Sequence, residues 1–258
     1  MTVVSDVRTR RLLGAETLVV VAIAVGLSAA RSVLVFASAA LAPGRLGAQQ
    51  ATLNGSAAPG HPWLDLGLQL AGVMRLLLPV GVVLVVVALR GERLADVGLR
   101  TDRWRRDVVL GAGAAALVGA VGLAGYLVSY AAGGSLAVVP TTLPPVWWRI
   151  PVLVLSAAAN AALEEVVLVG YLVRRGEQLG WSPGRTVATS GVIRGCYHLY
   201  QGVAGLLGNL LMGAVFARYF QRSGRIVPLI AAHTFIDVVA FCGYVLLAGH
   251  VAWLPAPR

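Results

Sequence analysis

The sequence predicts an all-α integral membrane protein, a bundle of about seven transmembrane helices. Of its 258 residues, 58% are apolar and only 12% are charged, whereas about a quarter of the residues of a soluble protein are charged. So few polar side chains cannot cover a folded chain in water, and lipid must solvate much of the surface. Seven apolar stretches are also long enough to cross about 30 Å of hydrocarbon as helices.

The predicted spans follow one another without a repeat, a linker or a low-complexity segment. They cover residues 16–41, 66–89, 108–131, 150–173, 186–201, 204–220 and 226–253. The fifth and sixth spans are the shortest, and only a turn at Gln201-Gly202 joins them, so a tight helical hairpin is expected there. The whole chain, residues 1–258, is therefore predicted to form one membrane domain.

The arginines predict the orientation of the bundle. The formal charge is +10, and all 21 basic residues are arginine. They are frequent before the first span and after the second, fourth and sixth spans, and sparse in the connections between. This alternation places the N-terminus in the cytoplasm and the C-terminus outside. Because the arginines do not gather on one face, nucleic acid is excluded as a partner.

The composition also suggests a host. Lysine is absent, whereas alanine, glycine and valine are abundant, as in proteins encoded by a GC-rich bacterial genome. The expected location is the bacterial cell membrane, with the lipid bilayer as the first partner. Residues 91–106 interleave apolar side chains with arginines, and two placements stay open for them. They could lie along the cytoplasmic headgroups or form a solvated basic loop.

Five ionisable side chains lie inside the predicted spans. Glu164 and Glu165 are in the fourth, His198 is in the fifth, and His233 and Asp237 are in the seventh. A charge in mid-membrane costs several kcal/mol, so such groups usually face the protein interior and have a function. His233 and Asp237 are four residues apart and share a helix face. The adjacent glutamates diverge by about 100°.

Two carboxylates beside two imidazoles suit the hydrolysis of an acyl bond by activated water. A carboxylate can take a proton from water, and an imidazole can stabilise the negative charge that develops on a carbonyl oxygen. The chain has no convincing serine nucleophile motif. The same glutamate, histidine and aspartate side chains could ligate zinc, so hydrolysis with or without a metal stays open at this point.

Structural roles are the alternative for some polar residues in the spans. Glu165 could anchor an ion pair with Arg194, and Asn160 lies one turn before Glu164 on the same helix face. Arg31 and Arg75 are expected to be structural or to extend toward the interface, and less often to contact substrate or lipid. Because five ionisable groups occur in the last four spans, a functional site is favoured over purely structural pairing.

The order and spacing of these residues resemble the CPBP intramembrane metalloproteases, the CAAX-protease and bacteriocin-processing group also called Abi proteins. The marks of that family are Glu-Glu-x-x-x-Arg, Phe-x-x-x-His and His-x-x-x-Asn/Asp on successive helices. The chain carries Glu164-Glu165, Arg194-Gly195-Cys196-Tyr197-His198 and His233-Thr234-Phe235-Ile236-Asp237. The resemblance covers roughly residues 150–245, whereas the first 140 residues carry no diagnostic motif.

The resemblance implies an intramembrane endopeptidase that acts on a membrane-associated peptide or protein. In that reading Glu164 and His198 activate the attacking water, and Glu165 supports them. His233 and Asp237 stabilise the oxyanion, or complete a metal site if the enzyme is metal-dependent. Prenylated CAAX substrates follow from the family name alone. Hydrolysis without a metal and hydrolysis with zinc are both compatible with the resemblance.

The sequence departs from the family at two positions. Val169 stands where the family has arginine, and Arg194 stands where it has phenylalanine. One hypothesis is that Arg194 restores the missing positive charge from a neighbouring helix. The alternatives are a catalytically inactive immunity or scaffold protein of the same fold and, less favoured, a proton-coupled transporter. No inverted repeat or pair of broken helices supports transport.

The depth of His198 presents a difficulty for the predicted site. Glu164 and His233 are about 12–15 Å from the cytoplasmic ends of their helices, whereas His198 is about 20 Å away, at about 1.5 Å per residue. The groups meet only if the fifth helix begins outside the hydrocarbon, tilts or bends. Ser182 followed by Pro183 is typical of a helix start, which favours a start at the interface.

Overall fold

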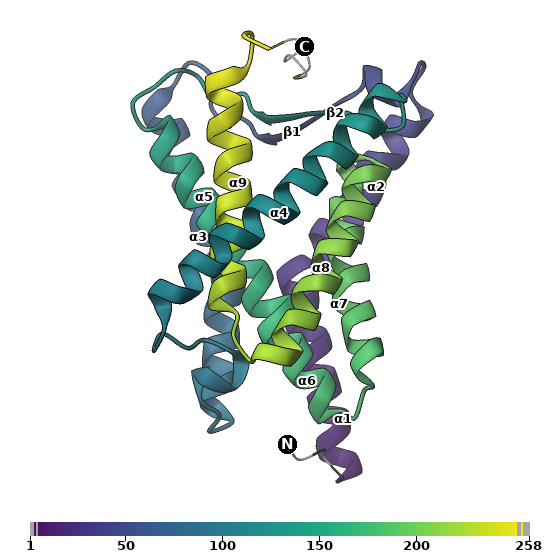
Figure 1. The fold of residues 1–258 in the computed structure, drawn as a ribbon, viewed down its shortest axis with the longest axis vertical. Coiled ribbons are helices and arrows are strands. Elements are labelled where there is room, and N and C mark those ends of the chain that lie inside the picture. The colour runs from purple at the N-terminus through teal and green to yellow at the C-terminus, as the bar shows by residue number, and fades with distance from the viewer. Residues whose placement is uncertain (1–2, 4, 252–253, 255–258) are drawn as a thin grey trace.

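The computed structural model describes residues 3, 5–251 and 254, and it confirms an all-α membrane bundle (Figure 1). Within these residues, six helices are long and apolar enough to cross a membrane. They are Val7–Leu41, Pro62–Leu89 (α3), Trp104–Ala131 (α4), Arg149–Gln178, Val203–Ser223 (α8) and Val227–Leu247 (α9). The chain is therefore an integral membrane protein.

Two of the long helices contain a π-helical segment. Ala22–Gly26 separates α1 (Val7–Val21) from α2 (Leu27–Leu41). In the fourth predicted span, the segment Glu165–Tyr171 separates α5 (Arg149–Glu164) from α6 (Leu172–Gln178). Such wider turns inside α-helices are rare and are frequent at functional sites. The second segment therefore marks the region of the two adjacent glutamates.

The predicted fifth span is a shorter helix, α7 (Pro183–His198), which a 3-10 turn, Leu199–Gln201, follows. Its 16 residues are fewer than the roughly 20 that cross hydrocarbon, and α7 packs against α8. A Cβ at Gly191 or Gly195 would lie 2.8 or 2.9 Å from a backbone carbonyl oxygen of α8. Gly202, with a φ of 98°, turns the chain. The expected hairpin is confirmed, and about seven spans is roughly consistent with six long helices and α7.

Two helix ends differ from the predicted spans. The first helix already begins at Val7, because the carboxylate of Asp6 accepts a hydrogen bond of 2.7 Å from the Thr9 backbone N–H and so caps the helix. The last helix ends at Leu247, shortly before Gly249 adopts a φ of 83°. Residue 253, the expected end of that span, lies outside the described residues.

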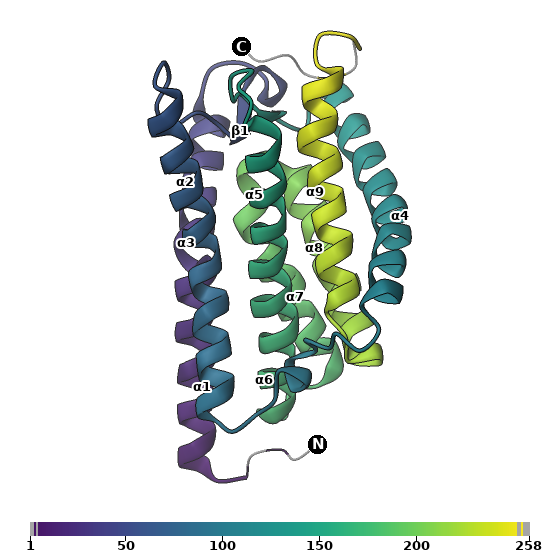
Figure 2. The ribbon, with the colours of Figure 1, turned by 90° about the vertical axis from the view of Figure 1, so that its left-hand side faces the viewer.

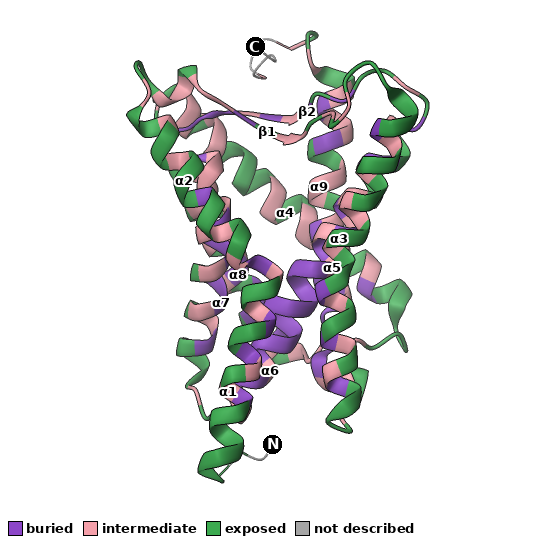
Figure 3. Cartoon of the chain, turned by 180° about the vertical axis from the view of Figure 1, so that it is seen from behind, coloured by how far each residue is buried: buried purple, intermediate pink, exposed green. Residues whose placement is uncertain are grey.

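The helix that runs from α5 to α6 forms the centre of the bundle. In Figure 2, α5 lies between the α1–α3 side of the bundle and the side formed by α9 and α4. Buried residues gather on this central helix in Figure 3. In the most apolar stretch of 18 residues, 67% of the central helix is buried inside the protein, whereas only 6% of α4 is buried. The central helix is thus the core, and α4 is left to contact lipid.

A short β-ribbon joins two of the connections between the long helices. Strands β1 (Gln50–Asn54) and β2 (Ala137–Thr141) pair in parallel, with Gln50 opposite Ala137. The ribbon lies at the end of the bundle where α9 finishes, and α1 begins at the opposite end (Figure 1). Chain ends on opposite sides of the bundle are what an odd number of crossings requires.

Residues 91–106 were expected to lie along the headgroups or to form a solvated loop. In the structure they pack directly onto the bundle. Val97 is completely buried, and the Gly98 carbonyl oxygen accepts a hydrogen bond of 3.0 Å from the Ile226 backbone N–H. Arg225 donates to Asp102 at 2.9 Å and to Asp107 at 2.6 Å. The hydrogen bond from Arg225 holds the pKa of Asp102 below its usual value. This connection therefore fixes the start of α4 beside the start of α9.

The contact between α4 and α9 predicts a difference between two neighbouring glycines. A Cβ at Gly111 would lie 2.6 Å from the Ala231 Cβ and 2.7 Å from the Pro228 carbonyl oxygen. Gly111→Ala should lower the free energy of unfolding by about 1–3 kcal/mol, because α9 must shift. Gly113→Ala is the matched control, since its Cβ meets nothing within 4 Å. Thermal unfolding in detergent measures both, and equal effects would contradict the packing.

Candidate functional site

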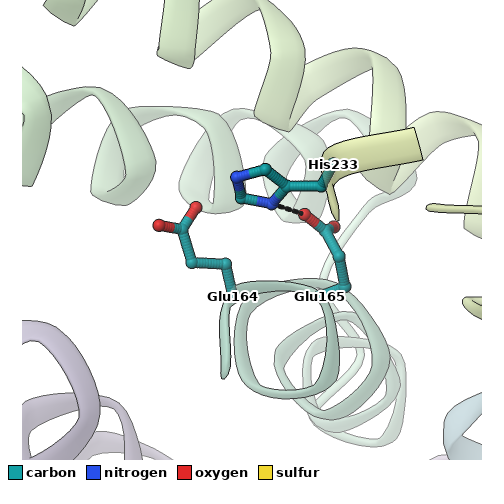
Figure 4. A group of neighbouring side chains, drawn as sticks. All are labelled: Glu164, Glu165 and His233. Carbon is teal, nitrogen blue, oxygen red and sulfur yellow. Dashed lines mark hydrogen bonds and ion pairs between the residues drawn. The ribbon is translucent and has the colours of Figure 1, made fainter. Parts of the chain in front are cut away.

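The candidate site lies where the central helix meets α7 and α9. Glu164 is the last residue of α5, and Glu165 is the first residue of the π-helical segment. All seven residues of that segment are buried. Figure 4 shows that both glutamate side chains project from this helix toward His233 of α9. The wider π turn thus lies at the point where two consecutive residues face one buried site.

Arg194 of α7 binds both glutamates. Its Nε donates to the Glu164 Oε2 at 2.8 Å, and its Nη2 forms an ion pair with the Glu165 Oε1. All three side chains are almost completely buried. Removing one partner of a buried ion pair leaves an uncompensated charge, so the three groups must be present together. The expected ion pair between Glu165 and Arg194 is confirmed, and Glu164 shares it.

The two departures from the family pattern have different surroundings. Arg194 supplies a positive charge to the glutamate pair from a neighbouring helix, as hypothesised. Its guanidinium also lies 5.5 Å from the centre of the Phe216 ring, a favourable contact for a cation. Val169 is completely buried and belongs to the apolar core. The charge is therefore present in the site although position 169 does not provide it.

His233 and Asp237 continue the same network along α9. The His233 Nδ1 lies 2.8 Å from the Glu165 Oε1 and 3.2 Å from the Arg194 Nη2. Its Nε2 lies 3.6 Å from the Asp237 Oδ2. That oxygen accepts a hydrogen bond of 3.2 Å from the Asn160 Nδ2. Asn160 was expected only to share a face with Glu164, and its contact with Asp237 could not be foreseen from spacing.

His198 meets the site despite the difference in depth expected from the sequence. Its Nδ1 is 3.0 Å from the carbonyl oxygen of Arg194, and its Nε2 is 3.9 Å from the Glu164 Oε1. The expected helix start is also found, because Ser182 caps α7 by accepting a hydrogen bond of 3.2 Å from the Arg185 backbone N–H. The structure thus brings all five predicted residues into one cluster.

The cluster is closed on most sides. The side chains of Glu164, Glu165, Arg194 and His233 are at most 3% exposed, whereas His198 is 12% and Asp237 is 17% exposed. Among the residues of the cluster, His198 and Asp237 are therefore the two with the largest exposed fraction. Within the described residues, the Glu165 Oε2 and the Arg194 Nη1 are buried without a hydrogen bond. Unsatisfied buried polar atoms are unusual and need a functional or structural reason.

Three of these residues have the composition of a metal site. Glu164, Glu165 and His233 each offer a ligand atom, and these atoms lie within 4.8 Å of one another. Carboxylate oxygen and imidazole nitrogen are normal zinc ligands. However, Arg194 already donates to both carboxylates and lies beside the His233 Nδ1. A divalent ion would have to displace this guanidinium, so the residues present fit a metal poorly.

A comparison with protein families agrees with the motifs. Residues 145–239 match the model described as Type II CAAX prenyl endopeptidase Rce1-like. The match is consistent with the CPBP and CAAX protease families and confirms the resemblance inferred from the sequence. It includes the glutamate pair, both histidines and Asp237, whereas α1–α4 lie outside it. Searches of curated proteins and of solved structures found no match.

The buried network predicts a strong dependence of stability on Arg194. Arg194→Met should lower the free energy of unfolding by about 3–5 kcal/mol, because two carboxylates remain buried without their cation. Arg218→Met is the control, since Arg218 is exposed on the neighbouring helix α8. Adding Val169→Arg to the Arg194→Met variant should recover part of the loss. Unfolding in detergent by circular dichroism tests this, and an unchanged midpoint for Arg194→Met would contradict the network.

Proposed function

Because the Rce1-like CAAX endopeptidase match spans the whole cluster, we propose that this membrane protein is an intramembrane endopeptidase with Glu164 and His198 as its water-activating pair. The observation that carries the proposal is the distance of 3.9 Å between the Glu164 Oε1 and the His198 Nε2. This distance is too long for a direct hydrogen bond. It suits a water molecule that contacts both atoms at about 2.8 Å.

The two glutamates are not equivalent, although they are adjacent. The Oε1 of Glu165 is bound by Arg194 and His233, and its Oε2 is buried. Glu164 uses only its Oε2 for Arg194, and its Oε1 faces His198. The oxygen of Glu164 that faces His198 is therefore the one placed to accept a proton from water. Glu165 positions Arg194 and His233.

The tautomer of His198 fits this role. The Arg194 carbonyl oxygen can only accept a hydrogen bond, so the His198 Nδ1 carries the hydrogen in the contact of 3.0 Å. The Nε2 of a neutral His198 then has a free lone pair directed toward Glu164. A water between two acceptors donates a hydrogen to each, and a lone pair of its oxygen is left for attack on a carbonyl carbon.

His233 provides the complementary group for the oxyanion. Its Nδ1 lies 2.8 Å from the Glu165 Oε1, whereas its Nε2 lies 3.6 Å from the Asp237 Oδ2, which is too far for a hydrogen bond. A hydrogen on the Nε2 can stabilise the negative charge that develops on the carbonyl oxygen of the substrate. Asp237 orients this nitrogen, and Asn160 in turn holds Asp237 through its hydrogen bond.

The reaction is hydrolysis of a peptide bond. The water oxygen bonds to the carbonyl carbon, and one of its protons passes to Glu164. The carbon–nitrogen bond then breaks, the proton passes from Glu164 to the leaving nitrogen, and the second proton of the water stays on the new acid. The products are a carboxylic acid and an amine, which ionise to a carboxylate and an ammonium group. A zinc ion, if it were bound at the glutamate pair, would polarise the carbonyl oxygen of the substrate. The carboxylate oxygens that would ligate it already accept hydrogen bonds from Arg194.

The class of substrate and the orientation of the protein in the membrane are the remaining parts of the proposal. We propose that the substrate is a membrane-associated peptide or protein, because the cluster lies about halfway along the central helix, Arg149–Gln178. The arginine-rich connections support a cytoplasmic N-terminus and an external C-terminus in a bacterial cell membrane. The alternative is an inactive immunity or scaffold protein of the same fold. The next experiment distinguishes it from an endopeptidase.

The proposed pair predicts the loss of cleavage in two variants. Glu164→Gln and His198→Ala should each reduce kcat about 10²- to 10⁴-fold, because the general base or its partner is lost. Glu177→Gln should leave the rate unchanged, since Glu177 lies on α6 outside the cluster. Purified protein in nanodiscs is assayed with a fluorogenic S-farnesylated peptide. Cleavage that survives both changes, or that no form of the protein shows, would refute the proposal.

The position of Arg194 predicts how activity responds to metal removal. Dialysis against a chelator should leave kcat within about twofold of its starting value, because the Arg194 guanidinium binds the carboxylate oxygens that a divalent ion would need. Metal content is measured by mass spectrometry on the same samples. Loss of activity on chelation, with recovery on adding zinc, would show that the ion displaces Arg194 in the active protein.

A further inference from the structure

Ser190 is a buried serine of α7 that the proposed mechanism does not use. It is 1% exposed, and its Oγ donates a hydrogen bond of 2.8 Å to the Leu168 carbonyl oxygen. Leu168 belongs to the π-helical segment Glu165–Tyr171. A serine inside a helix can bond to the carbonyl four residues before it in the same helix. The Ser190 hydroxyl instead joins α7 to the central helix.

The wide π turn explains why the Leu168 carbonyl takes a donor from another helix. In an α-helix, the Leu172 backbone N–H would bond to this carbonyl, four residues before it. In the structure, the Leu172 N–H bonds to the carbonyl oxygens of Val167 and Val169 instead. A buried carbonyl that loses its donor is destabilising unless another group replaces it. The Ser190 hydroxyl supplies that replacement.

The π-helical segment is also held by two other parts of the chain. A Cβ at Gly170 would lie 2.5 Å from the Val97 carbonyl oxygen, so the connection before α4 packs directly onto the backbone of the segment. At its end, the Tyr171 hydroxyl donates a hydrogen bond of 2.9 Å to the Glu16 Oε1 of α1. The segment cannot rotate or slide without breaking these contacts. It is therefore a fixed point against which α7 can be positioned.

Three polar residues of α7 meet the central helix one after another. Ser190, Arg194 and His198 are four residues apart, so they share one face of α7. Ser190 contacts Leu168, whereas Arg194 and His198 lie beside Glu164, which comes four residues earlier on the central helix. The contacts thus advance along α7 as they go back along the central helix, as in antiparallel neighbours. A slide of α7 would change all of them together.

The depth of α7 in the bundle depends on such contacts, because its 16 residues are too few to cross the hydrocarbon. The Arg194 side chain is long and can follow a shifted helix, whereas the Ser190 hydroxyl is one bond from Cβ and cannot. We infer that Ser190 is a positioning residue, which fixes the depth of α7 and so the distance of 3.9 Å between the Glu164 Oε1 and the His198 Nε2. The inference rests on the proposed function, but the position of α7 can be measured without cleavage.

The first test separates positioning from stability by kinetics. Ser190→Ala should reduce kcat about 10- to 100-fold and change KM less than about threefold, because a displacement of about 1 Å between reacting groups has a cost of that size. Ser190→Thr keeps the hydroxyl and should retain kcat within about threefold. The assay uses a fluorogenic S-farnesylated peptide in nanodiscs, at a temperature where circular dichroism shows every variant folded. A serine that only stabilised the fold would leave kcat unchanged there.

The second test measures the position of α7 directly. Spin labels are attached through Leu155→Cys on α5 and Val192→Cys on α7, two exposed positions, after Cys196 and Cys242 are replaced by serine. Double electron–electron resonance then gives the distance between the labels. Ser190→Ala should shift or broaden the distance distribution by about 1.5 Å or more, the rise of one helical residue. Ser190→Thr should leave the distribution unchanged.

Thr186→Val is the matched control for both tests. Thr186 lies one turn before Ser190 and is completely buried, but its hydroxyl donates to the Ser182 carbonyl oxygen of its own helix turn at 3.1 Å. Its loss should change neither kcat nor the distance. An unchanged distance in Ser190→Ala, a shift that leaves its kcat unchanged, or an equal shift in Thr186→Val would overturn the inference. A shift in Ser190→Ala without cleavage by any form of the protein would uphold the positioning of α7 and refute the endopeptidase.

Discussion

The contact of one guanidinium with two adjacent carboxylates is the interaction on which the rest of the structure depends. Arg194 joins α7 to Glu164 and Glu165 on the central helix, and His233 of α9 closes the same network. None of these groups can be buried alone at reasonable cost. The three helices must therefore come together in one arrangement, and the proposed site is the place where they meet.

Small residues make this arrangement possible. Gly191 and Gly195 bring α7 against the backbone of α8. A Cβ at Gly213 of α8 would lie 3.1 Å from the Arg194 Cδ, so this glycine leaves the space that the arginine stem occupies. Helices in lipid associate through close packing and not through hydrophobic exclusion of water. The same packing that joins the helices thus also positions the charged side chain.

The network also gives consecutive residues different roles in the proposed reaction. Glu165 is held by Arg194 and His233, whereas Glu164 keeps one oxygen directed at His198. A charge pair that was only structural would satisfy both carboxylates in the same way. The asymmetry, together with the limited exposure of His198 and Asp237, supports the assignment of Glu164 as the base.

Hydropathy and motif spacing were enough to predict an all-α membrane bundle and the five polar residues that the structure brings into one cluster, because each of these signals is local. Only the tertiary structure decided which glutamate oxygen is bound to Arg194 and that α7 brings His198 level with Glu164. It also decided the π-helical segment after Glu164 and the burial of Val97. These features depend on contacts between helices that are distant in the sequence, and the apolar side chains of the π-helical segment would suit an ordinary α-helix equally well.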